Sequence, residues 1–175
     1  DASGVALMRF SNNDANWTPV NGIYDNFTDK DLTNNTAWSI GQTGGTVSVV
    51  NGWMKLNDSS TVNGERVSAV ASFPTTSKDL LIEYTASLAQ TNQIVPALYA
   101  GNAVNTDEVS IAFWSDGTIA FNDAGTWKTA ANYSVDTNYN IKYLIRSLNK
   151  KYDLYINDFL KASNVSFRYA NNSIF

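Results

Sequence analysis

The strongest constraint on the fold of this chain is the alternation of apolar and polar side chains over residues 108–122. Val109, Ile111 and Phe113 occupy alternate positions in the first half of this stretch, and Ile119 and Phe121 do so in the second half. A period of two is typical of a β-strand with one face in a core. The stretch therefore predicts a hairpin of two half-buried strands.

The turn of this hairpin, residues 115–117, sets the register of the two strands. A two-residue Asp-Gly loop would pair Phe113 with Ala120 and mix the two faces. A three-residue loop pairs Phe113 with Ile119 and keeps the apolar residues together. We therefore predict the three-residue loop, with Gly117 in a left-handed conformation that a residue without Cβ adopts at no steric cost.

The other face of this hairpin carries one large aromatic side chain, Trp114, among small neighbours. An indole left uncovered in such a setting can stack on the C–H face of a sugar ring, so Trp114 is a candidate sugar-binding residue. The alternative is that a neighbouring strand or loop covers Trp114, because aromatic side chains bury large areas and usually lie in cores. The small neighbours on this face are Ser110, Ala112, Thr118, Ala120 and Asn122.

A second hairpin is predicted over residues 46–57, with Asn51-Gly52 at its turn. A two-residue type I′ loop, which Asn-Gly favours, pairs Val49 with Met54 and sends both to the core. Trp53 then lies on the opposite face. It is a second partly exposed indole and a further candidate sugar-binding residue.

A third hairpin joins residues 140–148 to residues 151–156, which we expect to turn at Asn149-Lys150. Pairing Leu148 with Lys151 places Arg146 opposite Asp153, as a cross-strand ion pair at the surface. Trp127, Tyr155 and Arg146 are weaker candidates for companions of Trp114 in a sugar site.

The remaining strand candidates are short and separated by turn residues. No long stretch has helical periodicity, and turn signals recur every 8–12 residues or so, as in β-sandwiches. The predicted fold class is therefore all-β, a two-sheet antiparallel β-sandwich or jelly roll. The other candidate strands are residues 22–27, 67–73, 80–88, 94–100, where Pro96 implies an edge or a bulge, and 127–129.

Composition excludes several functions. The chain of 175 residues contains no cysteine and no histidine, which removes disulfides, cysteine nucleophiles, histidine bases and the usual zinc sites. Its net charge of −4 opposes nucleic-acid binding. No apolar run is long enough to span a membrane.

A resemblance to a known family rests on several motifs in order. These are Tyr24-Asp-Asn-Phe27, the Asn-Gly hairpin ending in Trp53, Trp114-Ser-Asp-Gly-Thr, Gly125-Thr-Trp127, residues 139–146, residues 151–157 and residues 166–170. Over residues 22–175 the chain resembles concanavalin A-like (laminin G-like) jelly rolls, in particular modules appended to secreted bacterial polysaccharide lyases and glycosidases. None of these motifs is a catalytic signature.

The resemblance implies a non-catalytic carbohydrate-binding module. Its ligand would be a polysaccharide, its location extracellular, and its covalent partner a catalytic domain of the same parent protein. Two other functions stay open: a structural or adhesive spacer without a sugar ligand, and a jelly-roll lyase or glycosidase. The lyase or glycosidase is disfavoured, because the strands present no obvious pair of outward carboxylates.

The resemblance also implies a structural calcium ion. Calcium takes about six to eight oxygen ligands. The acidic residues Asp25, Asp29 and Asp31 are close together in the sequence, in a region expected to be a loop. We therefore expect these three carboxylates to be the metal ligands, with an ordinary acidic loop as the alternative.

The two ends of the chain set the expected domain boundaries. Residues 1–21 are expected to be an N-terminal extension, an edge strand or a linker, and residues 22–175 the sandwich domain. In the family a further strand pairs beside the first one, and here the chain stops at Phe175. Either residues 5–10 supply that partner or it belongs to a following polypeptide, and we favour the second.

Overall fold

The computed structural model describes residues 4–9, 25, 27–33, 38–60, 62, 67–71, 79–89, 91, 94–101 and 108–169, and the regular secondary structure in this part of the chain is almost entirely β. Its one helical element is a short 3₁₀ helix, η1 (Ser147–Asn149). The strands are β1 (Gly4–Arg9), β2 (Ser39–Gln42), β3 (Gly45–Val50), β4 (Trp53–Asp58), β5 (Val67–Val70), β6 (Leu80–Leu88), β7 (Val95–Ala100), β8 (Val109–Phe113), β9 (Thr118–Asp123), β10 (Thr126–Asn132), β11 (Tyr139–Arg146), β12 (Lys151–Ile156) and β13 (Phe159–Ser166).

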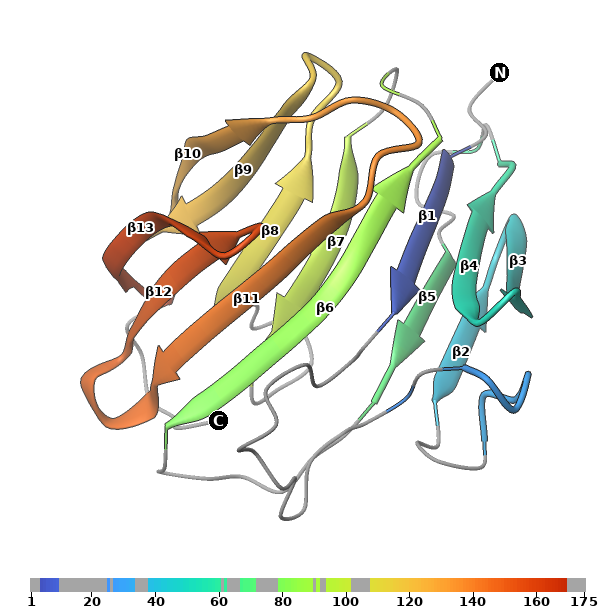
Figure 1. The fold of residues 1–175 in the computed structure, drawn as a ribbon, viewed down its shortest axis with the longest axis horizontal. Helices are drawn as coiled ribbons and strands as arrows, with labels where there is room; N and C mark the ends of the chain where they lie inside the picture. The colour runs from blue at the N-terminus through green and yellow to red at the C-terminus, as the bar shows by residue number, and fades with distance from the viewer. Residues whose placement is uncertain are drawn as a thin grey trace.

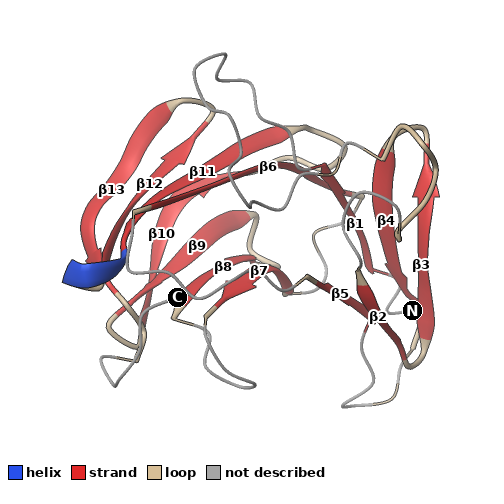
Figure 2. Cartoon of the chain, turned by 90° about the horizontal axis from the view of Figure 1, so that it is seen from below, coloured by secondary structure: helices blue, strands red, loops and turns tan. Residues whose placement is uncertain are grey.

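The strands form two stacked layers (Figures 1 and 2). One layer is a seven-stranded sheet in the order β13-β12-β11-β6-β1-β4-β3. The facing layer contains a four-stranded sheet, β10-β9-β8-β7, and a two-stranded sheet, β2-β5. All strand pairs in these sheets are antiparallel. The predicted antiparallel β-sandwich is confirmed.

The main core lies between the four-stranded sheet and the β6, β11 and β12 strands of the larger sheet. The β8–β9 hairpin has the predicted register, with Phe113 opposite Ile119, and Gly117 is left-handed as expected, with φ of +82°. This register directs the alternate apolar residues of both strands to one side. They pack there against side chains of the opposite sheet such as Tyr143 and Leu154.

A second, smaller core lies beside the β3–β4 hairpin. Val49 pairs with Met54 as predicted, and both turn residues, Asn51 and Gly52, have the positive φ of a type I′ loop. The side chains of this cluster come from β2, β3, β4, β5 and the segment before β2. They are Phe27, Leu32, Trp38, Ile40, Val47, Val49, Met54, Leu56, Val67 and Ala69.

The register predicted for the β11–β12 hairpin is wrong by two residues. Ile145 pairs with Tyr152 and Arg146 with Lys151, because the connection is longer than a two-residue turn. It consists of η1 followed by Lys150 in a left-handed conformation with φ of 52°. A shift of two leaves each side chain on its predicted face, so the core assignment holds.

Two strand predictions at the ends of the chain also differ from the structure. The segment expected to be an edge strand or linker contains β1, which pairs with β4 on one side and β6 on the other; a strand paired on both sides is not an edge. In the predicted first strand, residues 22–27, the two described residues, Asp25 and Phe27, lie in no strand, and Phe27 is left-handed with φ of 55°.

The strand β13 was not predicted as a separate element. A turn at Asn157 and Asp158 connects β12 to β13. These residues have φ of 52° and 64°, which Asn and Asp tolerate in hairpin turns. Residues 170–175 lie outside the described part of the chain, as do four of the residues 22–27. The idea of a missing closing strand, and the domain boundaries, therefore stay predictions.

Candidate functional site

The β8–β9 turn holds Trp114 by backbone hydrogen bonds on both sides. The Trp114 N–H donates to the Thr118 carbonyl at 2.8 Å, and the Trp114 carbonyl accepts from the Gly117 N–H at 3.1 Å. The same carbonyl accepts from the Tyr133 hydroxyl at 2.9 Å, and Asp116 accepts from the N–H and hydroxyl of Thr118 at 3.0 and 2.6 Å. The backbone that carries the partly exposed indole is therefore firmly anchored.

Trp127 lies next to Trp114 across the sheet. β10 pairs Trp127 with Asn122, and this register places the Trp127 ring 6.0 Å from the Trp114 ring, with 59° between their planes. Both side chains are partly exposed. Two of the five candidate sugar-binding residues are thus brought together on the outward side of the four-stranded sheet.

Most of the small neighbours of Trp114 are covered rather than open to solvent. Ser110, Ala112, Ala120 and Asn122 are each at most 2% exposed, because both faces of β8 and of the middle of β9 are buried. A period of two shows which residues share a face but not whether another part of the chain lies over that face. On this face, Thr118 and the two indoles keep partial exposure.

Polar atoms in this covered strip lack hydrogen-bond partners among the described residues. They are Glu108 Oε2, Ser110 Oγ, Trp114 Nε1 and Asn122 Nδ2. A buried polar group without a partner costs about 1–3 kcal/mol, so proteins usually supply a partner or an ordered water. Burial raises the pKa of Glu108, and the positive charge of Lys150 lowers it by a smaller amount. Because these four atoms are buried, they are not open to a ligand at the surface.

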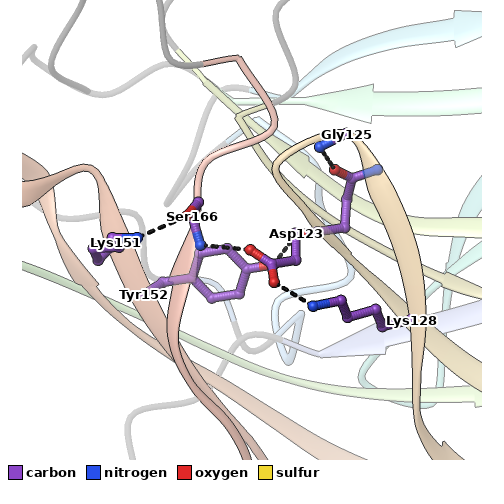
Figure 3. Close-up of polar contacts among 7 residues, drawn as sticks. Asp123, Gly125, Lys128, Lys151, Tyr152 and Ser166 are labelled. Atoms are coloured by element: carbon purple, nitrogen blue, oxygen red, sulfur yellow. Dashed lines mark hydrogen bonds and ion pairs between the residues drawn. The ribbon is translucent and has the colours of Figure 1, made fainter.

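A polar network at the end of β9 connects the two sheets (Figure 3). Asp123 accepts from the Ser166 N–H at 2.9 Å and from Lys128 Nζ at 2.6 Å. These hydrogen bonds, the one from Lys128 being the stronger, lower the pKa of Asp123. Lys151 Nζ donates to Ser166 Oγ at 2.6 Å, so the network runs from β10 through β9 to β13 and β12.

A second link between the sheets lies beside this network. The Tyr152 hydroxyl, in the core, donates to the Asn122 carbonyl at 2.5 Å, and the Asn122 side chain accepts from the Gly125 N–H at 2.8 Å. The Ala124 N–H also reaches the Ser166 carbonyl, at 3.3 Å. The β9–β10 turn is therefore fixed against the end of β13.

A pocket opens next to the Lys151–Ser166 pair. Its volume is about 180 Å³, and its walls are Asn149, Lys150, Lys151, Ser166 and Phe167. Among the residues that the structure describes, this lining includes two lysines, a serine and an asparagine, and no acidic residue. The sequence analysis missed this pocket, because it depends on the pairing of Lys151 with Ser166 and hence on β13. The adjacent Lys150-Lys151 pair in a turn was the signal that could have drawn attention to it.

The other candidate sugar-binding residues lie elsewhere. On β11, residues alternate between buried positions such as Ile145 and partly exposed ones such as Arg146, so Arg146 projects from the outward face of the seven-stranded sheet. Tyr155 is likewise partly exposed, and Trp53 is on β4 with partial exposure. The outward faces of two stacked sheets point in opposite directions, so Arg146 and Tyr155 cannot join Trp114 and Trp127 around one sugar ring.

The predicted pair of Arg146 and Asp153 is confirmed. Both guanidinium nitrogens at the end of Arg146 contact the Asp153 carboxylate, in a diagonal rather than a directly opposite position. Burial raises the pKa of Asp153, but hydrogen bonds from Arg146 and the Asn164 N–H outweigh it, and the pKa is lowered. Arg146 is therefore already engaged by a carboxylate of the protein itself.

The three candidate calcium ligands have different surroundings. Asp25 is buried, and its two oxygens accept from the Phe27 N–H and the Trp38 indole N–H, each at 2.9 Å. Asp29 accepts from the Asp31 N–H at 3.1 Å. Asp31 accepts from the N–H and hydroxyl of one threonine at 2.7 Å each, which lowers its pKa.

These surroundings fit calcium only in part. Asp25 is committed to two N–H donors, whereas Asp29 is exposed and Asp31 partly exposed. Within the described residues no three His, Cys, Asp or Glu side chains form a group able to hold a metal ion. Two carboxylates fall short of the six to eight or so oxygens that calcium takes, so carbonyls or water would have to supply the others.

Comparison with known proteins decides the family. A family model described as "Sialidase-like, CBM domain" matches residues 38–173. The chain belongs to this family. The match includes the two aromatic residues of the β8–β10 face, the Figure 3 network and the pocket. The domain is thus a sialidase-like carbohydrate-binding module.

A solved structure supports the fold of this module. A protein named sialidase matches with a TM-score of 0.72 and 18% sequence identity, over 86% of this chain but 14% of that protein. At this identity the likeness shows the fold alone. The search of curated proteins finds no match. The predicted carbohydrate-binding β-sandwich is confirmed, while its assignment to the concanavalin A-like type is not.

Proposed function

We propose that this module binds a polysaccharide or other glycan, without catalysis, for a longer glycan-degrading protein that works outside the cell. The observation that carries the proposal is the family match, which extends over 38–173 and hence over strands of all three sheets. The chain corresponds to only 14% of the sialidase that shares its fold, which fits an accessory domain. No helix in the described part of the chain is long and apolar enough to span a bilayer.

The chemistry of the described acidic residues also favours binding over catalysis. Glycosidases need two carboxylates free to act on opposite sides of one bond. Here Asp153 is paired with Arg146 and Asp123 with Lys128, while Glu108 is buried. The chain has no histidine to act as a base.

We place the glycan at the margin of the four-stranded sheet, over Trp114 and Trp127. Two partly exposed indoles 6.0 Å apart present apolar surface to the C–H face of a sugar ring, as aromatic side chains with a polar edge commonly do in binding sites. The Trp114 Nε1–H is itself buried, so the proposed contact is made by the exposed part of the ring.

Substitution of Trp114 tests this placement. Trp114→Ala should weaken glycan binding by about 30-fold, the loss of roughly 2 kcal/mol that defines an aromatic hot spot. Stability should fall by less than the 3–5 kcal/mol or so of a fully buried aromatic, because Trp114 is partly exposed. Binding can be measured by affinity electrophoresis and calorimetry with neutral, acidic and sialylated glycans, and stability by urea titration.

Trp53→Ala is the matched control, since Trp53 is also a partly exposed indole but lies on β4 of the larger sheet. It should leave the affinity within about twofold. Equal losses in the two variants would contradict the placement. A wild-type module that binds none of the glycans would contradict the function itself and favour a structural or adhesive spacer.

A structural calcium ion stays a prediction, with Asp29 and Asp31 as its remaining carboxylate ligands. If it is present, removal of the metal by EDTA should lower the melting temperature, and added calcium should restore it, because an ion that binds only the folded state stabilises that state by mass action. An Asp29→Asn/Asp31→Asn double variant should then melt at the same temperature with and without EDTA. A wild-type melting temperature unaffected by EDTA would contradict the prediction.

A further inference from the structure

Neutral hydrogen-bonding side chains continue the proposed glycan site along β10, the outer strand of the four-stranded sheet (Figure 1). Thr129 pairs with Ala120 and Asn132 pairs with Thr118, and both of these β10 residues are exposed. On the basis of the proposed glycan binding, we infer that the site takes an uncharged sugar chain lying along β10. Asn132 is the residue that selects this chain by its hydroxyl groups.

Trp127 and Asn132 face the same side of the sheet. Residues directly opposite each other in an antiparallel ladder share a face, and these two pair with Asn122 and Thr118. Those β9 residues alternate with the ones that lie in the main core, so they face outward. The odd spacing from Trp127 to Asn132 would put the two on opposite faces of a regular strand. The bulge between them in β10 brings both outward.

Trp114 lies on the other side of Thr118 from Asn132. The Trp114 N–H donates to the Thr118 carbonyl at 2.8 Å, so the order across the sheet is Asn132, Thr118, Trp114. Neighbouring strands are about 4.8 Å apart, which separates the Asn132 and Trp114 backbones by roughly 10 Å. One sugar chain of more than one unit can therefore contact both side chains.

The two indoles favour a chain over a single sugar. Their planes differ by 59°, so the two rings cannot lie flat against the same face of one pyranose. They suit successive units instead. The distance along β9 from the partner of Trp127 to the partner of Asn132 is about 13 Å at the usual rise of a strand, which is longer than one pyranose ring.

The charges around the site favour an uncharged ligand. Asp116, in the turn next to Trp114, is exposed, and its carboxylate accepts from the N–H and hydroxyl of Thr118. It would repel a carboxylate or sulfate group on a ligand. Lys128 lies on the other face of β10, with its ammonium group 2.6 Å from the Asp123 carboxylate. Among the described residues of β9 and β10, those on the outward face are all uncharged.

The side-chain amide of Asn132 suits a pair of adjacent sugar hydroxyls. Its NH₂ group donates and its oxygen accepts, and each hydroxyl of a sugar can do both. The hydroxyl of Thr129 lies on the same face and adds one more contact of this kind. Neutral hydrogen bonds at an exposed site are modest, so each residue should contribute a factor of about ten or less to the affinity.

The ligand class is tested first on the wild-type module. A glycan array with neutral and acidic members should show binding to at least one neutral oligosaccharide. For that ligand, the tetrasaccharide should bind about tenfold more tightly than the monosaccharide, because only the chain reaches both indoles and Asn132. Raising the salt from about 20 to about 500 mM should change the affinity by less than about twofold, since screening acts on charged ligands.

The role of Asn132 is tested with Asn132→Ala and with an O-methylated form of the bound oligosaccharide, which lacks hydroxyl donors. Methylation should weaken binding to the wild type by about tenfold, and binding to the variant by less than about threefold. A residue with a merely structural role would leave the two losses equal. Because Asn132 is exposed, the melting temperature of the variant should stay within about 3 °C of the wild type.

A matched pair of threonine variants tests the face. Thr129→Ala should weaken binding by about threefold to tenfold. Thr126→Ala should leave the affinity unchanged, because Thr126 is also an exposed residue of β10 but pairs with Asp123 and hence lies on the opposite face. This pair carries the test if Asn132→Ala fails to fold. Equal losses in the two threonine variants would contradict the inference.

Three further results would overturn the neutral chain while leaving glycan binding intact. One is binding to acidic glycans alone, the second is a monosaccharide that binds as tightly as the tetrasaccharide, and the third is a methylation loss unchanged in Asn132→Ala. Absence of binding to every glycan would instead refute the proposed function, and this inference with it.

Discussion

Phe113→Ala is expected to destabilise the module by about 3–5 kcal/mol, the usual cost of removing a buried phenylalanine ring. The Phe113 ring is 0% exposed and packs edge-on against Tyr133, with ring centroids 5.0 Å apart, and against Tyr139 at 6.2 Å. A domain has only about 5–15 kcal/mol of net stability, so the loss is a large share of the total. Urea unfolding followed by tryptophan fluorescence measures it.

The control for this prediction is Phe159→Ala at the start of β13. Phe159 is 71% exposed, so its removal should change the unfolding free energy by less than about 0.5 kcal/mol. Similar losses in the two variants would show that the sheets do not pack as described. The stability losses of these two variants also set the scale for the loss expected in Trp114→Ala. Trp114 follows Phe113 in the chain, and its side chain points to the other side of the sheet.

Asp25→Ala is expected to cost roughly 2–4 kcal/mol, because it leaves two N–H donors without their acceptor. Asp25 is 1% exposed, and it joins the left-handed Phe27 to the Trp38 indole within the second core. Asp25→Asn should lose about half as much. Its amide oxygen can still accept from the Phe27 N–H, whereas its NH₂ group cannot accept from the indole.

The matched control is Asp29→Ala, since Asp29 is exposed and accepts from the Asp31 backbone N–H. It should change stability by less than about 1 kcal/mol. If Asp25 instead acts as a calcium ligand, the loss in Asp25→Ala should appear with calcium present and vanish in EDTA. Thermal melts of the three variants and the wild type, each with calcium and with EDTA, separate these two roles.

The parts of the fold that were predictable are those controlled by residues close in the chain. The Asn51-Gly52 turn requires positive φ at two positions, so it determines the pairing of Val49 with Met54. In the β8–β9 hairpin, the alternating pattern admits only the three-residue loop, because any shift by one residue would move the apolar side chains to the other face. Face and register therefore follow from local geometry.

Where the local pattern was weak, the prediction failed. Residues 147–150 contain no Gly or Pro to specify a turn, and the chain there forms η1 and a left-handed Lys150, which shifted the β11–β12 register by two. The Asn157-Asp158 turn was a usable signal for β13 that the sequence analysis did not exploit. The interior place of β1, between β4 and β6, has no local signature at all.

The sequence by itself thus determined an all-β sandwich, the faces of its hairpins and the absence of histidine and cysteine chemistry. Only the tertiary structure decided that Trp114 meets Trp127 while Arg146 and Tyr155 lie on the opposite side. It also decided that Ser110 and Asn122 are covered and that Lys150, Lys151 and Ser166 share a pocket. Each of these depends on which distant strands become neighbours, whereas a period of two reports only the two sides of a single strand.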